Sequence, residues 1–245
     1  MATLRSRLTA SPAPFSLWVG VAKCVMRRDE LRDARELAIS GHASGPDAPL
    51  RATATALERA SHVRSVVLVE GISDQIAVET LASRQGRDLA AEGVVVISMG
   101  GAHSVGRFLD LFGSLGRDLR VSGLCDAAEA PHLCHALARA GYLQPATRPE
   151  LERGHFFVCK RDLEDALIRA IGSDALEALL TGQGDLGSFR TLQKQAGWRE
   201  APFVDQVRRF LGEGAQRKLR FAGLLVAALD VERQLRPLRD LLGRV

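Results

Sequence analysis

Short apolar runs alternate with longer segments of helix-forming composition through the middle of the chain. The runs predict four buried strands, over 66–69, 94–98, 119–125 and 155–159. Helices are expected after the first three, over 74–90, 102–115 and 129–141. Strands that alternate with helices indicate a parallel sheet with right-handed crossovers. We therefore expect an α/β fold with a four-stranded, mainly parallel sheet and flanking helices.

The chain after the fourth strand has only helical patterns. They predict helices over 162–171, 173–182, 186–196, 202–211, 215–230 and 231–242. Before the first strand, helices are expected at 28–39 and 50–61, separated by a linker at 40–49 that contains glycine and proline. The expected organisation is an N-terminal extension (1–49, partly disordered with one helix), a core (50–160) and a helical C-terminal portion (161–245).

Composition narrows the class of protein without assigning a function. Of the 245 residues, 46% are hydrophobic and 25% charged, and no apolar run is long enough to cross a membrane. Four irregularly spaced cysteines indicate no disulfide framework, so a reducing compartment, the cytoplasm, is expected. The net charge of +4 permits a polyanionic partner without requiring one. Residues 1–28 contain no acid, as in a transit peptide, but a disordered tail is the better interpretation.

Carboxylates follow three of the four predicted strands. They are Glu70 with Asp74, Asp126 with Glu129, and Asp162 with Glu164. In open α/β sheets, sites collect outside the carboxyl ends of the strands, so these acids are expected at one edge. Converging acids repel each other unless cations neutralise them, and carboxylates are the ligands that Mg²⁺ and Mn²⁺ prefer. The pattern therefore predicts a site with one or two Mg²⁺ or Mn²⁺ ions, suited to phosphoryl transfer.

Three of these stretches resemble the motifs of the Toprim domain. They are VLVEGISD, VVVISMGGA and GLCDAAE, and the resemblance runs from about residue 63 to 160. Topoisomerases, bacterial primases, recombination mediators and the OLD (overcoming lysogenization defect) nucleases share this Rossmann-like domain. The stretch FFVCKRDLEDALIRAIG resembles the OLD branch in particular. The resemblance implies a metal-dependent nuclease that acts on DNA or RNA.

The resemblance also implies roles for individual residues. Glu70 corresponds to the invariant glutamate of the family, and Asp126 to the first acid of its D-x-D motif. Asp74, Asp162 and Glu164 are implied as further metal ligands. Lys218, in GAQRKLRFAG, is the candidate for a lysine that OLD enzymes supply from a C-terminal helix. It would stabilise charge on the transferred phosphate.

The chain departs from the family pattern in two respects. Ala128 stands where D-x-D has its second acid, so either Glu129 substitutes or that position is lost. OLD proteins carry an ATPase before the Toprim domain, whereas this sequence has no G-x-x-x-x-G-K-[ST] loop. A stand-alone Toprim protein is therefore expected. Its candidate partners are DNA or RNA, a separate ATPase and a second copy of the chain.

Other residues are weaker candidates for binding. Backbone amides of Gly71, Gly100 and Gly101 could approach a phosphate, although a turn from strand to helix needs glycine anyway. Arg190 and Lys194 could contact a nucleic-acid backbone, although basic residues are usually solvated surface. The acids themselves could be helix caps. A zinc site among the residues from Cys125 to His135 is disfavoured, because the spacing fits no standard pattern.

Two alternatives to a nuclease stay open. Ala128 favours a binding module for nucleic acid or a protein partner, with a degenerate metal site. The primases suggest a nucleotidyl transferase, but they need template and zinc modules that have no counterpart here.

Overall fold

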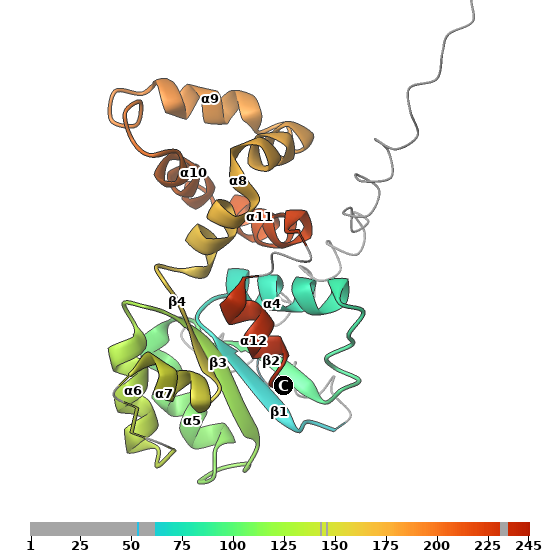
Figure 1. Cartoon of the computed structure of the whole chain (residues 1–245), viewed down its shortest axis with the longest axis vertical. Coiled ribbons are helices and arrows are strands. Elements are labelled where there is room, and N and C mark those ends of the chain that lie inside the picture. The colour runs from blue at the N-terminus through green and yellow to red at the C-terminus, as the bar shows by residue number, and fades with distance from the viewer. Residues whose placement is uncertain (1–52, 54–61, 143, 146, 231–234) are drawn as a thin grey trace, which may run out of the picture.

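The computed structural model describes residues 53, 62–142, 144–145, 147–230 and 235–245, and its centre is one β-sheet (Figure 1). The strands are β1 (Ser65–Val69), β2 (Val94–Ser98), β3 (Arg120–Asp126) and β4 (Phe156–Cys159). All neighbours pair in parallel, in the order β2-β1-β3-β4. The prediction of a four-stranded parallel sheet is confirmed. The carboxyl ends of β1, β3 and β4, which precede the acids, lie at the same edge.

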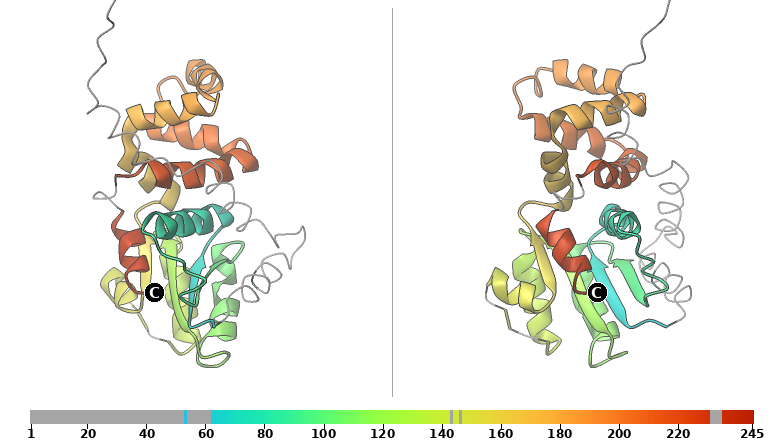
Figure 2. Two further views of the ribbon diagram at one scale, coloured as in Figure 1. Left: turned by 90° about the vertical axis from the view of Figure 1, so that its right-hand side faces the viewer. Right: turned by 45° about the vertical axis from the view of Figure 1, so that its right-hand side comes forward.

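Helices cover both faces of the sheet, and a helical portion lies beyond its carboxyl edge (Figures 1 and 2). They are α4 (Ile72–Arg84), α5 (Val105–Phe112), α6 (Ala130–Arg139), α7 (Arg148–Arg153), α8 (Leu163–Gly182), α9 (Leu186–Lys194), α10 (Phe203–Gly212), α11 (Ala215–Ala228) and α12 (Arg236–Leu242). A 3₁₀ turn, Ala102–Ser104, precedes α5. Within the described residues, no helix combines the length and the apolar character needed to span a membrane.

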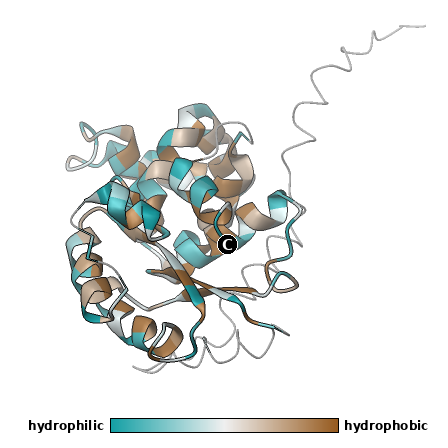
Figure 3. Ribbon diagram, turned by 60° about the horizontal axis from the view of Figure 1, so that its bottom comes forward, coloured by the Kyte–Doolittle hydropathy of each residue, from teal (hydrophilic) through white to brown (hydrophobic). Residues whose placement is uncertain are grey.

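Alternating residues of the strands form two hydrophobic cores. Val67 and Val69 face α4 and the helices from α8 onward, whereas Val66 and Leu68 face α5, α6 and α7. Apolar residues run along the sheet and the helix faces turned toward it (Figure 3). Because both faces of the sheet are covered, the strands are apolar at nearly every position, as parallel strands usually are.

The helical portion is tied to the sheet through α4. Helix α11 packs along α4, and α8 and α10 pack against α11. Gly172 interrupts α8 with a φ of 78°, which agrees with the two helices predicted over 162–171 and 173–182. Helix α12 then returns to β3 and β4. The proposed domain boundary at residue 160 remains a prediction.

Several predicted helix boundaries were wrong. Helix α4 ends at Arg84, before Gly86 with a φ of 73°, rather than at residue 90. The segment expected to be helical over 102–115 is helical only to Phe112, and α12 begins at Arg236. Helix α7 was not predicted. The predictions for 1–49 lie outside the described residues, as does the helix at 50–61 apart from Thr53.

Candidate functional site

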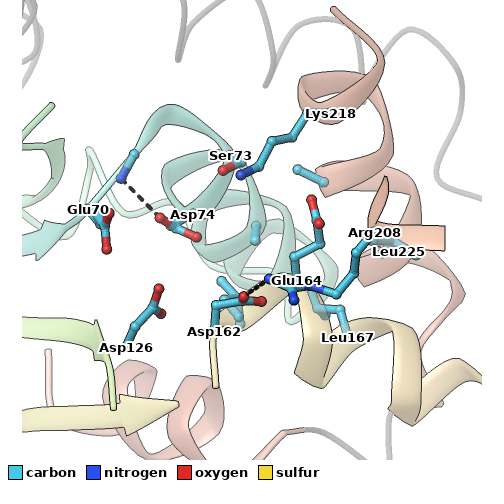
Figure 4. A pocket seen from close by; sticks show the side chains of 14 residues that line it. Glu70, Ser73, Asp74, Asp126, Asp162, Glu164, Leu167, Arg208, Lys218 and Leu225 are labelled. Carbon is cyan, nitrogen blue, oxygen red and sulfur yellow. Dashed lines mark hydrogen bonds and ion pairs between the residues drawn. The ribbon is translucent and has the colours of Figure 1, made fainter. Parts of the chain in front are cut away.

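An acidic pocket of about 160 Å³ lies between the carboxyl edge of the sheet and the helical portion. Its charged lining residues are Glu70, Asp74, Asp126, Asp162, Glu164, Arg208 and Lys218. Figure 4 shows them pointing into a common space, and they come from β1, α4, β3, α8, α10 and α11 or the ends of these elements. Five of the six acids expected from the sequence thus meet in one place.

The side of the pocket next to the sheet carries three carboxylates. Glu70 directly follows β1, and Asp126 is the last residue of β3. Asp74 lies in the first turn of α4, where its Oδ2 accepts a hydrogen bond of 2.9 Å from the amide of Gly71. That bond holds the turn between β1 and α4, so Asp74 is both a cap and a pocket residue.

The helical side of the pocket mixes acids with cations. Asp162 is the N-cap of α8, and its Oδ1 accepts a hydrogen bond of 2.7 Å from the amide of Asp165. Its Oδ2 pairs with the guanidinium of Arg208 from α10. Glu164 lies in the first turn of α8. Lys218 reaches in from α11 toward Ser73 (Figure 4).

Burial and repulsion by neighbouring carboxylates make ionisation of Asp74 and Asp126 unfavourable. Burial raises the pKa of Asp74 from 3.8 to about 6, and the charge of Glu70 adds to this against the lowering effects of the Gly71 amide and Lys218. Burial raises the pKa of Asp126 to about 7, with further increases from Asp74 and Glu70. Burial also raises the pKa of Glu164, while Lys218 lowers it. A cation bound among these groups would relieve the repulsion.

The donor set fits a hard divalent ion, because the pocket supplies oxygen ligands and an excess of negative charge. Within the described ranges, no three His, Cys, Asp or Glu side chains are placed to hold a metal ion as they stand. The carboxylates would therefore have to turn toward an ion, or bind it through water as Mg²⁺ sites often do.

The sixth predicted acid, Glu129, does not line the acidic pocket. It precedes α6 and lines a small neighbouring cavity that also includes Glu70 and Cys125. Ala128 is exposed and lines neither space. Glu129, the acid proposed to substitute for the missing second acid of D-x-D, thus lies outside the acidic pocket.

The glycines predicted to bind phosphate also form hydrogen bonds or turns within the protein. The amide of Gly71 donates to Asp74, and the amide of Gly101 donates to the backbone oxygen of Glu70 at 3.0 Å. Gly100 and Gly101 have φ angles of 73° and 127°, which favour glycine. The pair thus closes the turn after β2 and ties it to the end of β1.

The predicted nucleic-acid contacts lie outside the pocket. Arg190 and Lys194 are exposed on α9, where Arg190 bonds to Glu177 at 2.7 Å and to Gln193 at 2.8 Å. Sequence reasoning missed two residues with polar side chains that line the pocket, Arg208 and Ser73. Ser73 lies in a quoted motif, so its position beside Asp74 could have indicated it. Arg208 is one of many arginines, and no local pattern distinguishes it.

One family model matches the part of the chain that contains the sheet-side acids. A family model described as "Overcoming lysogenization defect protein-like, TOPRIM domain" matches residues 63–127. The chain carries an OLD-like TOPRIM domain. The matched OLD-like TOPRIM segment includes Glu70, Asp74 and Asp126, and ends before the helical side of the pocket. The resemblance inferred from the motifs is confirmed.

Solved structures extend the likeness to the helical portion. The C-terminal region of the Xanthomonas campestris pv. campestris OLD protein is 22% identical, and the alignment covers 75% of this chain and 92% of that one with a TM-score of 0.60. The C-terminal region of the Burkholderia pseudomallei OLD protein is 19% identical. That alignment covers 74% of this chain and 96% of the other, with a TM-score of 0.55. At these identities the likeness establishes a shared fold. No curated protein sequence matches the chain.

Proposed function

We propose that this OLD-like Toprim protein is a divalent-metal-dependent nuclease that hydrolyses phosphodiester bonds of DNA or RNA. The observation that carries the proposal is the convergence of five carboxylates and a lysine in one pocket. The raised pKa values of Asp74 and Asp126 support it, because a structural role does not require so many acids to be held together at this cost.

Each side of the pocket would have its own role in the reaction. Glu70, Asp74 and Asp126 would hold Mg²⁺ or Mn²⁺ on the sheet side. When bound, the ion supplies positive charge to the phosphate and lowers the pKa of a bound water. Lys218 is exposed at the opposite side, where its ammonium can approach a phosphate and stabilise charge that develops during cleavage.

The direct test is cleavage of plasmid DNA and of a labelled RNA with Mg²⁺ or Mn²⁺. We expect cleavage that EDTA abolishes and that Glu70→Gln and Asp126→Asn remove. Asp110→Asn is the matched control, because Asp110 is an exposed acid on α5 outside the pocket. An Asp126→Asn variant with the full activity of the unmodified protein would disprove the assignment.

A degenerate binding module is the second candidate function, and the observation that favours it is the exposed Ala128. Calorimetry with Mg²⁺ and Mn²⁺ distinguishes the nuclease from the binding module, since a degenerate site would not bind either ion at millimolar concentration. Incorporation of labelled nucleotides into a primer strand would instead support nucleotidyl transfer.

The cellular compartment and the partner proteins are proposed from the sequence. We propose a cytoplasmic protein with a separate ATPase or a second copy of the chain as partner. Sedimentation of the purified protein, alone and with nucleic acid, tests the proposed homodimer.

A further inference from the structure

The carboxylate of Asp162 already has a partner on each oxygen. Its Oδ1 accepts the hydrogen bond from the amide of Asp165, which caps α8, and its Oδ2 pairs with Arg208. Both oxygens of Asp162 are thus engaged by donors of the protein itself, and one of these donors carries a positive charge. Asp162 therefore differs from Glu70 and Asp126, whose carboxylates face the pocket from the sheet (Figure 4).

Arg208 is held inside the site. Its side chain is only 23% exposed, and its Nε is buried with no hydrogen-bond partner in the part of the chain that the structure describes. An arginine whose only role was to fasten α10 to α8 would not need to line the pocket. The segment just before α8 is already fastened to α10, since Arg161 bonds to Asp205 at 2.8 Å.

The charges in the pocket suit a single ion. Five carboxylates and two cations line it, which leaves three negative charges. Arg208 neutralises Asp162, and Lys218 is the cation that most lowers the pKa of Glu164. The three sheet-side acids are then the ones without a dedicated cation, and Mg²⁺ usually takes one or two carboxylates with water completing its shell.

We infer that Arg208 takes the place of a second metal ion. The pocket holds one divalent ion, on the sheet side, and the guanidinium of Arg208 supplies the positive charge on the helical side. Ala128, where a second acid would help to hold another ion, agrees with this assignment. The inference rests on the proposed function and concerns how its metal site is built.

The test is the number of Mn²⁺ ions that bind to each full-length chain, measured by the electron paramagnetic resonance signal of free Mn²⁺. We expect one ion for the unmodified protein and one for Arg208→Lys, which retains the charge. Arg208→Gln frees the carboxylate of Asp162, and we expect it to bind a second ion.

A charge-neutral double variant keeps the test decisive if Arg208→Gln alone does not fold. Asp162→Asn with Arg208→Gln removes one charge of each sign, and asparagine retains an oxygen to cap α8. We expect one ion with a Kd within about threefold of the unmodified value, whereas loss of even a metal-site partner typically costs about 10–100-fold. Two ions in the unmodified protein, one ion in Arg208→Gln, or a tenfold weaker Kd in the double variant would overturn the inference.

Failure of the inference can be distinguished from failure of the proposed function. Two bound ions together with metal-dependent cleavage would refute the role of Arg208 and leave the nuclease standing. No bound ion and no cleavage would refute the nuclease.

Discussion

The amide of Gly101 donates a hydrogen bond of 3.0 Å to the backbone oxygen of Glu70. A bond of 2.9 Å from Met99 to Val69 lies beside it, so the turn after β2 is fastened to the last residues of β1. Glu70 is a pocket carboxylate. The glycines that follow β2 thus help to position an acid of the site, and their binding of phosphate stays a prediction.

Replacing Gly101 with alanine should therefore weaken both the fold and metal binding. The φ of 127° is rarely adopted by L-residues, and no atom lies within 4 Å of an added Cβ, so the cost comes from the backbone. We expect a loss of about 1–3 kcal/mol in the free energy of unfolding, measured with urea. The Kd for Mn²⁺ should rise as well.

Gly106→Ala is the control for this substitution. Gly106 lies in α5, also with open space around an added Cβ, and alanine there should stabilise by about 0.5–1 kcal/mol. Equal effects of the two substitutions on unfolding would contradict the proposed role of the Gly101 turn.

The metal-free protein should lose stability as the pH rises from 5 to 8. Asp74 and Asp126 have folded-state pKa values of about 6 and about 7, against 3.8 as their ordinary value. Between these values the folded chain binds more protons than the unfolded chain, so stability falls as pH increases. Thermal unfolding at several pH values measures this trend.

Divalent metal should reverse that trend. Mg²⁺ or Mn²⁺ competes with protons for the same carboxylates, so the rise in Tm on adding metal should be larger at pH 8 than at pH 5.5. Asp126→Asn should raise the metal-free Tm at pH 8 and reduce the response to metal. A response that does not depend on pH would argue against binding by these acids.

Much of the site could be predicted because the parallel sheet organises it. Strands buried on both faces appear in the sequence as short apolar runs, and a parallel sheet brings the residues after them to one edge. This rule was enough to predict that Glu70, Asp74 and Asp126 belong to the site, since each lies at or just beyond a strand end.

The remainder of the site depends on tertiary contacts that no local pattern encodes. The pair of Asp162 and Arg208 joins residues 46 positions apart on different helices. Glu129 was predicted to belong to the metal site, but it lies just before α6 and lines the neighbouring cavity instead. Helix α7 spans only six residues and contains Pro149 near its start, so its period is too short to detect.

Arg84 should be important for stability because it clamps α11 to α4. It donates hydrogen bonds to the backbone oxygens of Val226 at 2.5 Å and Leu229 at 2.9 Å, at the C-terminal end of α11. The carbonyls at the C-terminal end of a helix carry partial negative charge, so a cation is favourable there. We expect Arg84→Met to lower the free energy of unfolding by about 1–3 kcal/mol, measured with urea.

Arg107→Met is the matched control for the Arg84 clamp. Arg107 is exposed on α5, and an exposed substitution usually changes stability by less than about 0.5 kcal/mol. The prediction fails if the two variants unfold at the same urea concentration.

Lys218 should act in cleavage and not in binding of the metal ion. It is exposed and lines the pocket on the side opposite Asp126 (Figure 4). Lys218→Met should reduce the single-turnover rate of cleavage by about 10²–10³-fold, the typical loss when one charge-stabilising group is removed. Mn²⁺ should still bind, and more tightly at a given pH, because the substitution removes a neighbouring positive charge.

Lys194→Met controls for the loss of a lysine from the helical portion. Lys194 is exposed on α9 and does not line the pocket, so the cleavage rate with saturating nucleic acid should be unchanged. Loss of Mn²⁺ binding in Lys218→Met would show that the lysine holds the site together. A Lys218→Met protein that cleaves at the unmodified rate would remove Lys218 from the reaction.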